Sequence, residues 1–108
     1  MKVVVQVSDY NSLTKAIRSV NNLRNEMPEA QIEVVFHQDA IKGLTKDSEY
    51  KDAIRELLSK GIDVMACRNS MNAFSLKEED LLGNVKVVKS GVAEIVRKQA
   101  EGWIYLRL

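Results

Sequence analysis

The most regular feature of the chain is a series of short apolar runs dominated by β-branched residues. Four runs of four or five residues are rich in valine or isoleucine, at positions 3–7, 32–36, 62–66 and 85–88. Only Gln6 interrupts the valines of the first run. Short apolar runs of this kind are typical of strands that are covered on both faces of a sheet. The sequence therefore predicts four buried strands.

Between these runs, the apolar residues recur every three or four positions, which is the spacing of one helix face. This pattern predicts helices over residues 13–27, 48–60 and 91–101, ended by Pro28, Gly61 and Gly102 respectively. Shorter helical pieces are expected at 37–44, 68–72 and 77–82. Strands that alternate with helices favour a mainly parallel sheet between two helical layers. The predicted fold class is α/β, a three-layer α/β/α sandwich.

The last six residues, 103–108, alternate instead of forming a continuous apolar run. Trp103 and Tyr105 fall on one face, and Ile104 and Leu106 fall on the other. Such a strand is expected at an edge of the sheet, where a partner chain can cover it. We therefore expect a five-stranded sheet and a homo-oligomer, with Trp103 and Tyr105 at the contact between subunits.

Composition narrows the range of functions. The chain has 108 residues, which suits one domain spanning 1–108, and its net charge of +1 offers no large basic field for nucleic acid. No apolar run is long enough to cross a membrane, and no secretory signal is evident, so the cytoplasm is the expected compartment. One cysteine and one histidine leave no ligand set for a metal site, and the five glycines form no nucleotide-binding fingerprint. No cofactor or metal is expected.

The candidate chemistry lies where the predicted strands end, because ligands in such sheets bind beyond the carboxyl ends of the strands. The only cysteine, Cys67, ends the third strand, and the only histidine, His37, follows the second. A thiolate is favoured at a helix N-terminus and beside a cation, so the following turn, Arg68 and a protonated His37 would each make Cys67 more acidic. A buried, inert cysteine is the alternative, and His37 can equally cap a helical turn.

Five residues near these strand ends could bind a small anion, and Arg68, directly after the third strand, is one of them. Asn69 and Ser70 follow the third strand, while Ser90 and Gly91 follow the fourth and open a helix with free main-chain amides. The same residues can serve only as turn and capping residues.

Four segments of the chain resemble the DsrE/DsrF-like family, in particular a branch of small archaeal and bacterial proteins. The segments are Ala66–Met71, Ser90–Trp103, Lys2–Val7 and Glu33–His37. The resemblance implies an α/β/α fold and homo-oligomers, often trimers or hexamers. It also implies a cysteine that carries sulfur as a persulfide between donor and acceptor proteins, and the matching cysteine is Cys67.

Two functions are consistent with these features. The first is a sulfur carrier or sulfurtransferase subunit that uses Cys67, with His37 as a possible assistant. A single cysteine suits a carrier, because a second cysteine in the chain would discharge the persulfide as a disulfide. The second is a non-catalytic subunit that holds a small anion near Ser70 and Ser90. The reactivity of the Cys67 thiol distinguishes them.

Overall fold

A computed structural model describes all residues from Met1 to Leu108. Five strands form one sheet in the order β4-β3-β2-β1-β5, and every neighbouring pair is parallel. The strands are β1 (Lys2–Val7), β2 (Gln31–Phe36), β3 (Asp63–Cys67), β4 (Lys86–Val88) and β5 (Ile104–Arg107). The five strands predicted from the sequence are all present, and β5 lies at an edge as expected. The prediction of four buried strands is wrong for β4, which forms the other edge of the sheet and whose residues are exposed or half-buried.

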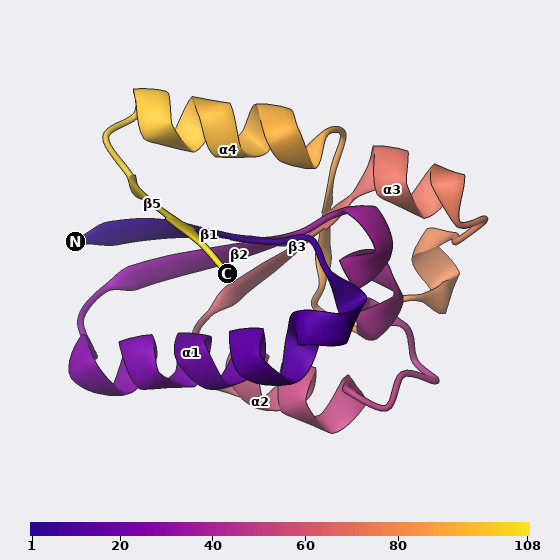
Figure 1. Cartoon of the computed structure of the whole chain (residues 1–108), viewed down its shortest axis with the longest axis horizontal. Helices are drawn as coiled ribbons and strands as arrows, with labels where there is room; N and C mark the ends of the chain where they lie inside the picture. The colour runs from indigo at the N-terminus through magenta and orange to yellow at the C-terminus, as the bar shows by residue number, and fades with distance from the viewer.

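Helices cover both faces of the sheet, which confirms the three-layer α/β/α architecture (Figure 1). The helices α1 (Leu13–Glu26) and α2 (Lys51–Ser59) lie on one face, and α4 (Gly91–Ala100) lies on the other. The short helix α3 (Arg68–Ala73) continues directly from β3. Three 3-10 helices, η1 (Tyr10–Ser12), η2 (Gln38–Leu44) and η3 (Glu78–Asp80), complete the connections. None of the helices is long and apolar enough to cross a membrane.

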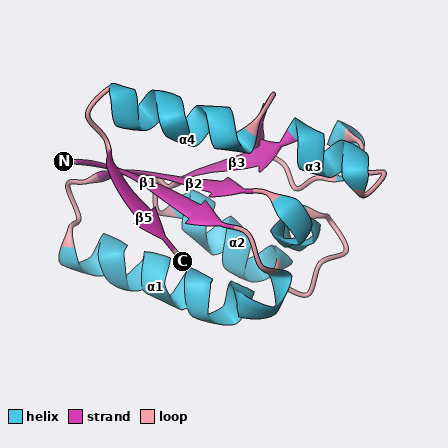
Figure 2. Cartoon of the chain, turned by 45° about the horizontal axis from the view of Figure 1, so that its top comes forward, coloured by secondary structure: helices cyan, strands magenta, loops and turns pink.

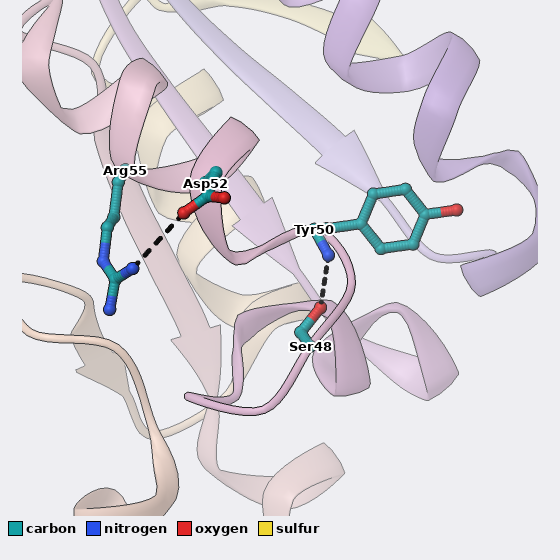
Figure 3. Close-up of polar contacts among 4 residues, drawn as sticks. All are labelled: Ser48, Tyr50, Asp52 and Arg55. Carbon is teal, nitrogen blue, oxygen red and sulfur yellow. Dashed lines mark hydrogen bonds and ion pairs between the residues drawn. The ribbon is translucent and has the colours of Figure 1, made fainter.

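The start of α2 illustrates how local polar contacts set the helix boundaries (Figure 3). The Oγ atom of Ser48 accepts a hydrogen bond from the main-chain N–H of Tyr50 at 2.9 Å. This bond closes a turn first, so the helix predicted to open at Ser48 begins at Lys51. Within α2, Arg55 pairs with Asp52 at 3.4 Å on the exposed side.

The two faces of the sheet are packed very unequally. The face under α1 and α2 holds a cluster of 22 buried apolar residues. The face under α4 holds only five, Val4, Val35, Met65, Ile95 and Trp103. Most of the apolar burial that stabilises the fold therefore lies on the α1 and α2 side.

The apolar side chains of β5 and α4 differ from what the sequence pattern suggests, and the expectation for Trp103 is wrong. Trp103 is buried under α4 within its own chain, so it is not an exposed contact for a partner subunit. Of the apolar residues of α4, Ile95 is buried, whereas Val92 and Val96 are 61% and 59% exposed. The reason is that α4 lies over β1, β2, β3 and β5 with no second long helix beside it, so the side chains on its outer side are left uncovered (Figure 2).

Candidate functional site at the carboxyl edge of the sheet

Three elements converge at the carboxyl ends of β2 and β3. Cys67 is the last residue of β3 and also the N-cap of α3, His37 directly follows β2, and Gly91 is the first residue of α4. In Figure 2, α3 and the start of α4 lie at the same end of the sheet. In the parallel pairing of β2 with β3, Phe36 is level with Ala66, so His37, the next residue, lies beside Cys67. The fold therefore brings together the chain's only histidine and only cysteine.

Hydrogen-bond donors surround the sulfur of Cys67. The main-chain N–H of Gly91 donates to Sγ at 3.2 Å. Burial is the largest single influence on the pKa of the Cys67 thiol and raises it. Hydrogen bonds from the Ser70 hydroxyl and from the N–H groups of Gly91, Ser70 and Asn69 together outweigh burial. They hold the pKa of Cys67 below its usual value, although the residue is only 4% exposed.

Gly91 is needed for this close approach. A Cβ atom at Gly91 would lie 3.1 Å from Cβ of Cys67, 3.2 Å from Cβ of His37 and 3.2 Å from Cγ1 of Val35. These distances are shorter than an ordinary van der Waals contact between carbon atoms. The absence of a side chain thus lets the first amide of α4 reach the sulfur.

Ser70 links the Cys67 loop to the loop that follows β2. Its Oγ atom accepts a hydrogen bond of 2.7 Å from the main-chain N–H of Gln38. Gln38 adopts a positive φ of 52°, a left-handed conformation that is uncommon for a residue other than glycine. The hydroxyl of Ser70 has two roles, because its oxygen accepts a hydrogen bond from Gln38 and its proton is donated to Cys67.

His37 is buried and held by a polar side chain of β1. Its Nε2 atom lies 2.9 Å from Nε2 of Gln6. Burial lowers the pKa of His37 below 6.5, so the side chain is neutral at pH 7. Burial therefore disfavours the protonated His37 that was expected to acidify Cys67, whereas the donors described above favour the thiolate.

The remaining candidate residues lie around this centre without joining it through their side chains. Arg68 pairs with Glu78 of η3 at 3.2 Å. Asn69 is exposed and contributes its main-chain N–H. The Oγ atom of Ser90 caps α4 by accepting from the N–H of Ala93 at 3.2 Å. Ser90 thus fulfils the capping role considered for it.

Two residues connect to this site in a way that the sequence analysis did not predict. Gln6 contacts His37, and the hydroxyl of Tyr105 on β5 donates to Oε1 of Gln6. The signal for Gln6 was present in the sequence, because it is the one polar residue in a run of buried valines. The part played by Tyr105 depends on the pairing of β5 with β1, which the sequence does not reveal.

Other potential sites lie elsewhere or are not formed. No group of three or more histidine, cysteine, aspartate or glutamate side chains is placed to hold a metal ion. An open hollow of about 870 Å³ is lined by polar residues that include Arg55, Asp63 and Lys86. Asp63 begins β3 and Cys67 ends it, so this hollow is at the opposite end of the sheet from the thiol.

Comparison with known proteins identifies the family. The family model described as DsrE/DsrF-like matches residues 1–108. The chain belongs to the DsrE/DsrF-like family. No functionally curated protein matches it. The family membership confirms the resemblance carried by the segments around Cys67 and Gly91.

Solved structures of similar proteins agree with the fold. The protein of unknown function MTH1491 from Methanobacterium thermoautotrophicum has 38% sequence identity and a TM-score of 0.91, with 99% of this chain and 98% of that chain covered. The ychN protein from E. coli has 15% identity and a TM-score of 0.82, with 99% and 97% covered. The conserved protein of unknown function BT1422 from Bacteroides thetaiotaomicron has 16% identity and a TM-score of 0.80, with 99% and 94% covered.

Proposed function

We propose that this protein carries sulfane sulfur as a persulfide on Cys67. The observation that supports the proposal is the set of donors around Sγ, namely the N–H of Gly91 at 3.2 Å and the hydroxyl and amides of the α3 turn. A thiolate is the form of cysteine that attacks sulfur, and these donors favour it. Membership of the DsrE/DsrF-like family points in the same direction.

The loading step requires no oxidant and no cofactor. The Cys67 thiolate attacks the outer sulfur of a donor persulfide, R–S–SH. The bond between Sγ and the outer sulfur forms, the S–S bond of the donor breaks, and the donor leaves as the thiolate R–S⁻. The proton of the outer sulfur moves with it to Cys67. Transfer to an acceptor thiolate is the same reaction in reverse, which suits a chain with a single cysteine.

Two measurements test this proposal. Intact mass after exposure to a low-molecular-weight persulfide or thiosulfate should increase by one sulfur atom, and Cys67→Ser should show no increase. The alkylation rate of the folded protein against pH should give a thiol pKa below that of a model thiol. An alkylation rate no faster than that of a model thiol, together with no sulfur adduct from either donor, would refute the carrier function.

Burial of the thiol, at 4% exposure, is the observation that favours the second candidate, a non-catalytic subunit that binds a small anion. In that case the donors around Sγ would be structural. In this second function, the side chains of Ser70 and Ser90 would keep the hydrogen bonds that they accept within the chain, from the N–H groups of Gln38 and Ala93 respectively. An inert Cys67 with tight binding of a small anion would support this second function.

A carrier must meet its donor and acceptor, and we propose that it does so as a homo-oligomer, a trimer or a hexamer. Four large apolar side chains on α4 and β5 are exposed, and they are Val92, Val96, Ile104 and Tyr105. Exposed apolar surface of this kind is typical of a subunit contact. Light scattering at micromolar concentration should give a mass of three chains or a multiple of three, and a monomer would contradict the proposal.

A further inference from the structure

Three polar side chains form a continuous connection across the sheet, from the edge strand to the candidate site. Tyr105 belongs to β5, Gln6 to β1, and His37 directly follows β2. The hydroxyl of Tyr105 donates to Oε1 of Gln6, and Nε2 of Gln6 lies 2.9 Å from Nε2 of His37. In the sheet, Gln6 pairs with Val35 of β2 and Tyr105 pairs with Val4 of β1, so Tyr105 and His37 are both diagonal neighbours of Gln6 on one face of the sheet.

The direction of these bonds fixes the position of the proton on His37. A carboxamide oxygen only accepts and a carboxamide nitrogen only donates. Because Oε1 of Gln6 accepts from Tyr105, the Nε2 group of Gln6 must donate to His37. Nε2 of His37 is therefore an acceptor without a proton, and a neutral imidazole then carries its proton on Nδ1.

We propose that Tyr105 is a positioning residue that acts through Gln6 to hold His37 as the neutral Nδ1–H tautomer beside Cys67. In this arrangement Nε2 is occupied, so it does not accept the proton of the thiol. A protonated His37 would bring two donors face to face at Gln6, which is unfavourable. Burial acts in the same direction, because it lowers the pKa of His37.

The consequence for the site concerns the free side of the imidazole. No hydrogen bond within the chain reaches Nδ1 of His37, and this atom is not among the fully buried unpartnered atoms. The Nδ1–H group is thus a donor without a partner within the chain. Its use in sulfur loading rests on the proposed function, whereas the tautomer itself does not.

Nitrogen NMR of the intact protein labelled with ¹⁵N-histidine tests the inference directly, since His37 is the only histidine. The expected spectrum shows an unprotonated Nε2 and a protonated Nδ1 at pH 7. Tyr105→Phe removes the donor and keeps the ring, so Gln6 is free to rotate. In this variant the Nε2–H tautomer should appear, and the His37 titration should move to higher pH.

Tyr10→Phe is the matched control, because the hydroxyl of Tyr10 donates to Glu49, away from this connection. It should leave the His37 signals unchanged. A wild-type protein with the Nε2–H tautomer, or a Tyr105→Phe spectrum identical to the wild type, would overturn the inference. If the tautomer behaves as expected but the wild-type protein accepts no sulfur, the inference is supported and only the proposed function fails.

Discussion

Replacement of Gly91 by alanine is the most direct test of how the site is built. The added Cβ would meet Cβ of Cys67 at 3.1 Å and Cβ of His37 and Cγ1 of Val35 at 3.2 Å. The two Cβ atoms are fixed to the ends of β3 and β2, so they cannot rotate away. The start of α4 must therefore move outward by a few tenths of an ångström, and the N–H of Gly91 moves with it.

The cost follows from two opposing effects. An extra methyl group in a packed interior typically costs about 1–3 kcal/mol. Alanine is a better helix former than glycine by up to about 1 kcal/mol, which offsets part of the cost. We expect Gly91→Ala to lower the free energy of unfolding by about 1–2 kcal/mol, which corresponds to a fall in Tm of roughly 5–15 °C for a chain of this size.

The chemical effect is separate from the loss of stability. The hydrogen bond from Gly91 to Sγ, 3.2 Å long in the wild type, becomes longer, so the pKa of the Cys67 thiol should rise. The assay is the rate of alkylation of the folded protein against pH. The midpoint of this profile is the quantity to compare, because a destabilised variant can also expose the thiol more often and change the absolute rate.

Gly83→Ala provides the matched control. A Cβ at Gly83 would have no atom within 4 Å. This variant should keep the wild-type Tm and the wild-type pH profile. If Gly91→Ala also melts like the wild type and its alkylation midpoint does not move to higher pH, then the close approach of α4 is not what acidifies Cys67.

Three other predictions follow from single contacts. Ser70→Ala should raise the pKa of the Cys67 thiol, measured by the same pH profile, because it removes the hydroxyl that favours the thiolate. Arg68→Ala should leave this profile unchanged, since Arg68 pairs with Glu78; a shift to higher pH would show that the guanidinium acts on the thiol. Glu33→Gln should raise the free energy of unfolding relative to the wild type more at pH 9 than at pH 5, as measured by urea unfolding. Burial is the largest cause, and a hydrogen bond with Glu94 is the next, of the rise in the pKa of Glu33 from 4.5 to about 8. In the wild type, the stability that comes from this proton is complete below pH 4.5 and is lost as the pH rises through about 8. At roughly 1.4 kcal/mol per pH unit, the loss is at most about 5 kcal/mol. Equal pH dependence of the two proteins would contradict this account.

The elements of the fold could be predicted because their signals are local. Valine-rich runs and helical spacing identify strands and helices, and Gly61 and Gly102 end helices with positive φ values of 75° and 94°. The neighbourhood of Cys67 and His37 could also be predicted, because residues that follow parallel strands lie at the same edge.

The contacts that define the site could not be predicted, since they depend on the distance between segments far apart in the chain. Gly91 is recognisable from sequence as a helix start, but its contact with Cys67 depends on where α4 lies on the sheet. The same holds for Trp103. Its alternating context suggested an exposed strand, whereas α4 folds back over it. Glu33 shows this limit most clearly, because its carboxyl group lies in a residue that is only 2% exposed, in a strand otherwise rich in apolar residues.

The unequal packing of the two sheet faces has a consequence for the lifetimes of the hydrogen bonds. Partial opening of a native protein begins where the fewest apolar contacts must be broken. Detaching α4 exposes a cluster of five residues, while the 22-residue cluster on the other face remains closed. Amide protons of α4 should therefore exchange with solvent long before those of β1 and β2. Since the first amide of α4 is bonded to the sulfur, each such opening also releases Cys67, and the accessibility of the thiol follows the motion of one helix.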